Sequence, residues 1–266
     1  MKVEVFTDGY VIHGDSTSDE VMNFVSAKVG LVPLIIADPP YGNIVKDEWD
    51  KVKTSEEDFV KWMVSWTWEW SEHLVPGGAF YVWGGIGKPE FRPFLRYVCE
   101  AEVKKEFEVA NIITWKKRRG YGVQNNYLFT REECVYFVNG NAKRPHCFNI
   151  PLLEDRRGYA GYNKKYPAKS EYYRRTNVWT DITEMFSGKV HPTQKAQRLC
   201  EVMIEIHTAP GEWVIDPFAG AGTTAFAARK LGRKFVIIEK DEEYFQDVVK
   251  RLTKTPEGPQ ENNAKD

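Results

Sequence analysis

Cysteine is scarce in this sequence, and its placement excludes two common structural roles. Four cysteines are scattered along the 266 residues, with no Cys-x-x-Cys pair and no matching Cys/His spacing: Cys99, Cys134, Cys147 and Cys200. Disulfide frameworks and zinc sites need paired spacings of that kind. We therefore predict neither disulfides nor a metal site, and a reducing compartment suits the chain.

Long apolar runs are also missing. No run approaches the ~18 residues that a membrane span needs. Residues 1–14 show no basic region followed by an apolar one, so we expect no secretory signal and predict a cytoplasmic protein. The length of 266 residues suits one sizeable α/β domain, or a catalytic domain with a smaller insert.

Neither sign of charge is in excess, yet the charges are unevenly distributed. The formal net charge is −1, which by itself argues against a nucleic-acid-binding protein. Between Lys116 and Asn177, however, 14 Lys and Arg face 5 Asp and Glu, whereas the rest of the chain holds 23 basic and 33 acidic residues. A basic segment inside an acidic chain indicates a surface for a polyanion. The alternative is that these residues only solvate a loop.

Apolar runs and helical spacings alternate along the chain, which predicts an α/β fold with a mainly parallel sheet. Short apolar runs that predict buried strands are Leu31–Ala37, Ala79–Trp83, Val109–Trp115, Cys134–Val138, Gly211–Asp216 and Lys234–Glu239. Helical patterns cover Glu20–Val29, Ser55–His73, Gln194–His207 and the residues after Gly222 up to Leu231. Residues 75–78 indicate a turn, and residues 140–177 are irregular.

The helix predicted from Ser55 to His73 has a good N-cap in Ser55. Trp62, Trp66 and Trp70 follow at i, i+4 and i+8, so they share one face of that helix. This spacing favours core packing over a platform for stacking bases.

A glycine turn between a strand and a helix marks a candidate nucleoside site. The segment is Val-Ile-Asp-Pro-Phe-Ala-Gly-Ala-Gly-Thr-Thr (214–224), where Gly220 and Gly222 lack the Cβ atoms that would keep a ligand off the backbone. The next strand ends in Glu239, whose carboxylate can accept hydrogen bonds from both hydroxyls of a ribose. Ala225 or Phe226 stands where a dinucleotide fingerprint would need a third glycine. The motif therefore favours S-adenosylmethionine over NAD.

A second motif, Asp38-Pro39-Pro40-Tyr41, directly follows a predicted buried strand. An exocyclic aryl amine is a poor nucleophile because its lone pair is delocalised into the ring. The Asp38 carboxylate and the Pro39 carbonyl, held by two rigid prolines, can accept its two hydrogens and favour attack on a methyl group. Tyr41 can stack on an unpaired base. The alternative is a plain turn that ends a strand.

The two motifs resemble those of the DNA amino-methyltransferases, in particular the circularly permuted β group of adenine-N6 and cytosine-N4 enzymes. That group has the Asp-Pro-Pro-Tyr motif first, then the target-recognition region and then the cofactor motif, which is the order found here. Further matches, which extend the resemblance over roughly residues 5–252, are residues 11–16, 111–116, 131–133, 177–179 and 191–195. Ala196 stands where the family usually has proline.

The resemblance implies a Rossmann-like S-adenosylmethionine-dependent methyltransferase fold, circularly permuted, with a mainly parallel seven-stranded sheet and an inserted target-recognition region. The expected divisions are the catalytic part (1–139), the target-recognition insert (140–177), the cofactor-binding part (178–255) and a disordered tail (256–266).

The resemblance also assigns roles to residues. Asp38, Pro39, Pro40 and Tyr41 are the expected catalytic residues, and Thr193, Gln194 and Lys195 are expected near the methionine end of the cofactor. Asp15 is expected to border the cofactor pocket. The full set of candidate cofactor-binding residues is Asp15, Asp38, Thr193, Gln194, Lys195, Asp216, Phe218, Gly220, Gly222, Thr223, Thr224, Glu239 and Lys240.

The implied reaction is direct in-line methyl transfer to the N6 amine of adenine in duplex DNA, with the target base flipped out of the helix. Basic and aromatic residues of the positively charged segment are expected to contact DNA. These candidates are Lys116, Lys117, Arg118, Arg119, Arg156, Arg157, Tyr159, Lys164, Lys165, Arg174 and Arg175.

Several alternatives stay open. Aspartate at position 38, where cytosine-N4 members more often have serine, favours adenine. The competing functions are a cytosine-N4 DNA methyltransferase, an adenine methyltransferase acting on RNA, a methyltransferase acting on protein nitrogen, and a non-catalytic DNA-binding subunit. The expected partner is double-stranded DNA at the nucleoid of a prokaryotic or phage-infected cell. The resemblance leaves open a homodimer and a cognate restriction endonuclease.

Overall fold

The computed structural model describes residues 1–41, 55–85, 91–101, 107–122, 124–125, 127–140, 144–156, 171–182 and 195–256. Over these residues the elements are, in order, β1 (Lys2–Phe6), β2 (Gly9–His13), α1 (Asp19–Lys28), β3 (Val32–Ala37), α2 (Glu56–Ser71), β4 (Leu74–Gly84), α3 (Phe91–Ala101), β5 (Phe107–Tyr121), β6 (Phe129–Asn139), β7 (Leu152–Arg156), β8 (Tyr172–Arg174), β9 (Val178–Trp179), α4 (Gln197–His207), β10 (Trp213–Asp216), α5 (Thr223–Lys230), β11 (Lys234–Glu239) and α6 (Glu242–Lys254). The predicted α/β class is confirmed. Within these residues, no helix has the length and apolar character to cross a membrane.

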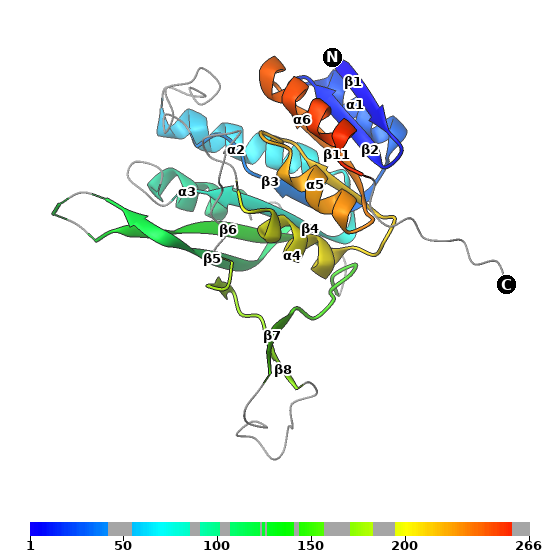
Figure 1. The fold of residues 1–266 in the computed structure, drawn as a ribbon. Helices are drawn as coiled ribbons and strands as arrows, with labels where there is room; N and C mark the ends of the chain where they lie inside the picture. Colours follow the sequence, from blue (N-terminus) through cyan, green and yellow to red (C-terminus); the bar gives the residue numbers. More distant parts are fainter. Residues whose placement is uncertain are drawn as a thin grey trace.

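Nine strands form one sheet in the order β1-β2-β11-β10-β3-β4-β6-β5-β9 (Figure 1). Five of the eight neighbouring pairs are parallel and three are antiparallel, so the sheet is mainly parallel as predicted. It has nine strands where seven were predicted, because short strands extend both edges. β1 is largely exposed and β9 has two residues, so neither has the apolar run that marks a buried strand.

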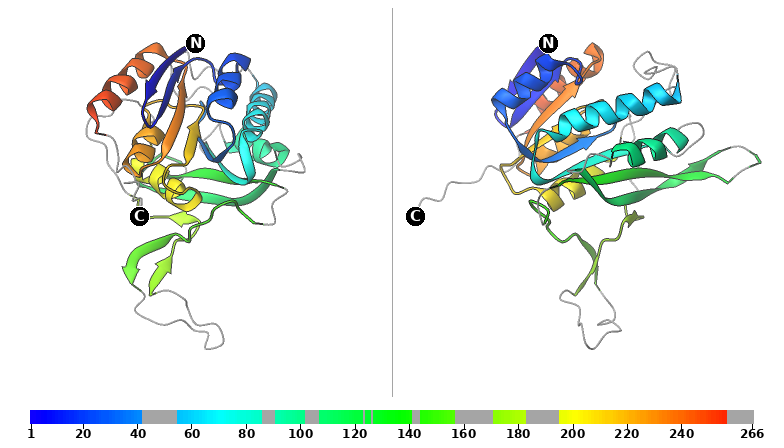
Figure 2. Two further views of the ribbon diagram at one scale, coloured as in Figure 1. Left: turned by 90° about the vertical axis from the view of Figure 1, so that its right-hand side faces the viewer. Right: turned by 180° about the vertical axis from the view of Figure 1, so that it is seen from behind.

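Helices cover both faces of this sheet (Figure 2). Side chains from α1, α2 and α3 pack on one face, and side chains from α4, α5 and α6 pack on the other. All six residues of β3 are buried, with Leu34 and Ile36 facing α4–α6 and Ile35 and Ala37 facing α1–α3. A continuous apolar run is what a parallel strand covered on both faces requires.

Helix α2 packs its tryptophans against the sheet and against the glycine turn. Ser55 caps the helix, since its Oγ accepts a hydrogen bond from the backbone N–H of Asp58 at 3.1 Å. Trp66 and Trp70 are fully buried and Trp62 is partly buried, which confirms the prediction of core packing. Trp66 also meets Phe218 edge to face, with 4.9 Å between ring centroids.

Two features differ from the sequence-based expectations. Helix α3 was not predicted, although its buried residues Phe94, Tyr97, Val98 and Ala101 follow a helical spacing. The turn expected at residues 75–78 lies inside β4, where the register with β3 shifts. Gly77 has a φ of 78° there, so the chain makes the expected bend without leaving the strand.

Two hairpins extend from the body of the molecule (Figure 1). One is formed by β5 and β6, and its outer part carries Lys116 to Arg119. The other is formed by β7 and β8, which pair in a separate two-stranded sheet. Residues 140–177 were expected to be irregular, but this second hairpin lies in their described part. Three-residue β8 is too short to show a strand pattern.

A buried histidine anchors the segment that leads into β7. His207 Nδ1 lies 3.0 Å from the carbonyl oxygen of Cys147, so Nδ1 must carry a hydrogen. Burial lowers the pKa of His207 to about 4, and the neutral ring then accepts a hydrogen bond at Nε2 from the Tyr81 hydroxyl at 2.8 Å. His207 therefore holds the base of the β7–β8 hairpin against the sheet.

We expect Gly222→Ala to destabilise the fold more than Gly211→Ala. Both glycines have a left-handed φ, +75° and +80°, which costs an alanine about 1 kcal/mol. A Cβ at Gly222 would also lie 2.8 Å from a Cγ atom of fully buried Val248, whereas a Cβ at Gly211 meets nothing within 4 Å. Urea unfolding should show a loss of roughly 2–4 kcal/mol at Gly222 against about 1 kcal/mol at Gly211. Equal losses of unfolding free energy in the two variants would contradict the close contact between Gly222 and Val248.

Candidate active site

Three adjacent parallel strands bring the two motifs together. β10 pairs in parallel with β3 on one side and with β11 on the other. Asp38 follows β3, Asp216 ends β10 and Glu239 ends β11. Because the carboxyl ends of parallel strands lie at one edge of a sheet, these three carboxylates share that edge, where ligands bind in open α/β sheets.

Asp216 holds the glycine turn in shape. Its Oδ1 accepts a hydrogen bond from the backbone N–H of Phe218 at 2.9 Å, and its Oδ2 accepts one from the Thr224 hydroxyl at 2.6 Å. Burial raises the pKa of Asp216 to about 7 despite these two bonds. Gly220 and Gly222 have φ values of 49° and 75° and complete the turn into α5.

Glu239 sits beside that turn. Its Oε2 accepts a hydrogen bond from the N–H of Gly220 at 2.7 Å, and its Oε1 accepts one from the N–H of Asp241 at 2.7 Å. Burial raises the pKa of Glu239 to about 7. Each carboxylate oxygen keeps a further lone pair, which suits two hydroxyls of a ribose. These acceptors therefore fit the ribose of the predicted adenosine.

Asp15 and Lys240 form an ion pair at the rim of this region. Lys240 Nζ lies 2.8 Å from Asp15 Oδ2, and Asp15 Oδ1 accepts hydrogen bonds from the N–H and hydroxyl of Thr17. Gly14 N–H donates to the carbonyl oxygen of Glu239 at 3.0 Å, which places the pair next to the strand end. Lys240 is mostly exposed, so it can reach a ligand or solvent.

The Asp38 carboxylate lies at the centre of a polar cluster. Tyr41 Oη donates to Asp38 Oδ1 at 2.8 Å. Lys195 Nζ donates to both carboxylate oxygens at 2.8 Å and lies 3.1 Å from Tyr41 Oη. The sequence predicted Lys195 near the methionine end of the cofactor; among the described residues, its side chain contacts the Asp-Pro-Pro-Tyr motif.

Glu132 on β6 completes this cluster. Its Oε2 lies 3.1 Å from Lys195 Nζ, and its Oε1 forms an ion pair with Lys117 Nζ. Lys195 is 8% exposed, and burial opposes its charge, but Asp38 and Glu132 outweigh burial and hold its pKa well above the usual value. The sequence marked Glu132 only as part of a family landmark. The signal that could have pointed to a functional role for Glu132 is its acidic side chain next to the apolar run of β6.

The candidate DNA contacts differ in their surroundings. Lys116, Arg118 and Arg174 are exposed. Lys117 pairs with Glu132, and Arg175 pairs with Asp181 at 2.6 Å, with its guanidinium over the Trp179 ring. The structure describes only the backbone of Arg119 and Arg156. The predicted residues that lie outside the described ones are Arg157, Tyr159, Lys164, Lys165, Thr193 and Gln194, together with residues 257–266 of the predicted tail.

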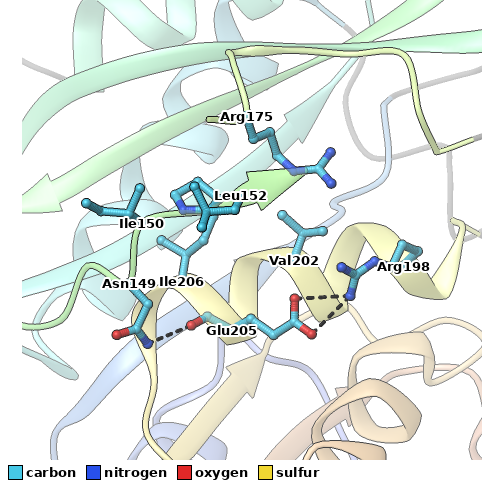
Figure 3. A pocket seen from close by; sticks show the side chains of 9 residues that line it. Asn149, Ile150, Leu152, Arg175, Arg198, Val202, Glu205 and Ile206 are labelled. Carbon is cyan, nitrogen blue, oxygen red and sulfur yellow. Dashed lines mark hydrogen bonds and ion pairs between the residues drawn. The ribbon is translucent and has the colours of Figure 1, made fainter. Parts of the chain in front are cut away.

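A pocket of about 130 Å³ lies between α4 and the base of the β7–β8 hairpin (Figure 3). Arg198 is held there by both oxygens of Glu205 at 3.0 Å. The pocket is lined by Asn149, Ile150, Pro151, Leu152, Arg175, Arg198, Val202, Glu205 and Ile206. Arg175 is thus the candidate DNA contact that borders it, and Asp38 and Glu239 do not line it.

The fold and the two strand-end motifs define a Rossmann-like methyltransferase. The profile of the DNA methylase family matches residues 32–250, and the chain belongs to that family. It is 31% identical to the type II methyltransferase M2.LlaDCHI of Lactococcus lactis subsp. cremoris over 241 residues, covering 83% of this chain and 82% of that protein. It is 30% identical to the DNA adenine methyltransferase YhdJ of Escherichia coli K12 over 261 residues, covering 91% and 82%.

Solved structures agree with this assignment. The M1.HpyAVI–SAM complex matches with a TM-score of 0.62 and 27% identity, covering 91% of this chain and 98% of that one. The cytosine-N4-specific PvuII DNA methyltransferase matches with a TM-score of 0.67 and 19% identity, covering 97% and 89%, which shows the fold alone. The predicted family and fold are confirmed, and this chain is a DNA methyltransferase.

We expect Asp216→Asn to remove a pH-dependent cost to stability. The folded chain keeps a proton on Asp216 up to about pH 7, whereas the unfolded chain loses it near pH 4. The free energy of unfolding of the wild type should therefore fall, relative to the variant, by roughly 2–3 kcal/mol between pH 5 and 8. Urea unfolding at several pH values measures this.

Thr224→Val serves as the opposite control. It removes the hydroxyl that donates to ionised Asp216, so its free energy of unfolding should fall more steeply than that of the wild type over the same pH range. Parallel curves for all three proteins would contradict the assignment of the raised pKa to Asp216.

Proposed function

We propose that this chain transfers a methyl group from S-adenosylmethionine to the N6 amine of adenine at specific sites in duplex DNA. The observation that carries the proposal is the Asp38 carboxylate at the end of β3, one strand away from the glycine turn at the end of β10. An acceptor for the amine and a site for an adenosine therefore share one edge of the sheet.

The residues around the glycine turn would hold the cofactor. Glu239 would accept the ribose hydroxyls, Gly220 leaves room for close approach, and the Asp15–Lys240 pair lies at the rim. Phe218, Thr223 and Thr224 belong to the same turn. When bound, S-adenosylmethionine supplies an electrophilic methyl group on a sulfonium.

Asp38 would act on the target amine. Its Oδ1 already accepts from Tyr41 and Lys195, whereas Oδ2 accepts from Lys195 alone. Oδ2 therefore keeps a lone pair for one hydrogen of the amine. The Pro39 carbonyl would accept the other, and together they would favour a tetrahedral nitrogen whose lone pair points at the methyl group.

Specificity for adenine rests on Asp38 and on the likeness to an adenine methyltransferase over 91% of this chain. The cytosine-N4 alternative stays open, because the matched family includes both N6-adenine and N4-cytosine methylases. Exposed Lys116, Arg118 and Arg174 would bind DNA phosphates, and the target base would be flipped out of the duplex. A homodimer and a cognate endonuclease stay predictions.

Duplex DNA incubated with the protein and S-adenosylmethionine, then digested to nucleosides, should contain N6-methyldeoxyadenosine by mass spectrometry. Asp38→Ala should lower the rate at least roughly 100-fold, because it removes an acceptor that acts at the reacting nitrogen. Asp247→Ala, on the surface of α6, is the matched control and should keep wild-type activity. N4-methyldeoxycytidine would overturn the base assignment. No methylated base in duplex DNA, single strands or RNA would overturn the function.

Cofactor affinity should rise with pH. Glu239 has a pKa of about 7, and its ionised form is the better acceptor for ribose hydroxyls. Calorimetry should therefore show a Kd for S-adenosylmethionine that falls up to about tenfold from pH 6 to 8 and levels off above pH 8. Glu239→Gln should bind weakly with little pH dependence, whereas Glu243→Gln on α6 should behave like the wild type. A flat wild-type profile would refute this role of Glu239.

A further inference from the structure

A chain of four alternating charges crosses from β3 to β5. Asp38 bonds Lys195, Lys195 pairs with Glu132 across 3.1 Å, and Glu132 pairs with Lys117. Lys195 lies two residues before the start of α4, Glu132 is on β6 and Lys117 is on β5. The four groups carry two negative and two positive charges, so the cluster is neutral as a whole.

Strand geometry places these groups on one face. Glu132 alternates with Cys134, which packs in the core beneath α4, whereas Glu133 alternates with Val135, which packs in the opposite core. Trp115 lies directly opposite Glu132 in the β5–β6 register, and the Lys117 ammonium lies 5.7 Å from the centroid of the Trp115 ring. Glu133 instead bonds the Thr114 hydroxyl at 2.7 Å and pairs with Arg131.

The position of Lys195 decides how much negative charge Asp38 offers to a substrate amine. A buried ammonium with one carboxylate partner neutralises the negative charge of that partner. An ammonium between two carboxylates divides its positive charge between them, so each carboxylate keeps part of its negative charge. Glu132 supplies the second carboxylate. Burial opposes ionisation of Glu132, but Lys195 and Lys117 outweigh burial and hold its pKa below the usual value. Lys117 thereby keeps Glu132 ionised, and ionised Glu132 attracts the Lys195 ammonium.

We propose that Glu132 is a positioning residue for methyl transfer: it shares Lys195 with Asp38, so that Lys195 orients the Asp38 carboxylate without neutralising it, and Lys117 is its counter-charge. Lys117 then belongs to the active site, not to the DNA-phosphate surface assigned from the sequence. The inference rests on the proposed role of Asp38 as acceptor for the target amine.

The test compares Glu132→Gln with Glu133→Gln, an equivalent change on the neighbouring residue and the other face of β6. Single-turnover methylation at saturating DNA and cofactor should fall at least tenfold in Glu132→Gln and less than threefold in Glu133→Gln. The Kd for DNA and its salt dependence should stay close to wild-type values in both, since both glutamate side chains are mostly buried and pair within the chain. Equal rates in the two variants would overturn the inference.

Lys117→Met provides an independent test should Glu132→Gln fail to fold. If Lys117 is the counter-charge to Glu132, Lys117→Met should methylate at least threefold more slowly than the wild type at saturating DNA. The slope of log Kd against log salt should stay unchanged. If Lys117 contacts a phosphate instead, the rate should be unchanged and the slope reduced by about 0.9, and this outcome would overturn the inference.

A wild-type protein that methylates no DNA would overturn the proposed function and this inference with it. An active wild type, together with equal methylation rates in Glu132→Gln and Glu133→Gln, would overturn this inference and leave the proposed function standing.

Discussion

The central position of β10 is the constraint on which the site depends. β10 has only four residues, yet its parallel pairing with β3 and β11 aligns the ends of β10 and β11 with the end of β3, which lies far from them in the sequence. Parallel strands need long crossover connections, and α5 and the residues between β3 and β10 provide them. A change in the register of β10 would separate Asp38 from the glycine turn, and the amine acceptor from the site for an adenosine.

Burying charge at that edge is costly, and the structure offsets the cost in two ways. Asp216 and Glu239 receive backbone and hydroxyl hydrogen bonds, but burial still raises the pKa of each to about 7. Around Asp38 the charges are paired instead, with Lys195 between two carboxylates. An unpaired buried charge would change its protonation state or destabilise the fold. Hydrogen bonding without a cation, as at Glu239, suits a binding site for neutral hydroxyls. Ion pairing, as at Asp38, suits a carboxylate that acts in its charged form.

The hairpins divide the positive charge of the chain into two groups. Lys117 and Arg175 each pair with a carboxylate and lie against an aromatic ring. Lys116, Arg118 and Arg174 are exposed. On β5, alternation separates Lys117 from exposed Lys116 and Arg118, because neighbouring residues point to opposite faces of a strand. A count of basic residues along the sequence does not separate the two groups, and only the exposed one is free to meet a polyanion.

Local signals in the sequence determined the α/β class, the strand–turn–helix at Gly220 and Gly222, the Ser55 cap and the buried tryptophan face, because each depends on spacings of a few residues. The motifs also predicted roles for Asp38 and Glu239. Only the tertiary structure decided that Lys195 bonds Asp38, 157 residues away, and that Glu132 and Lys117 join them, because such contacts depend on which strands become neighbours. Short β8 and β9 escaped prediction since two or three residues carry no periodicity.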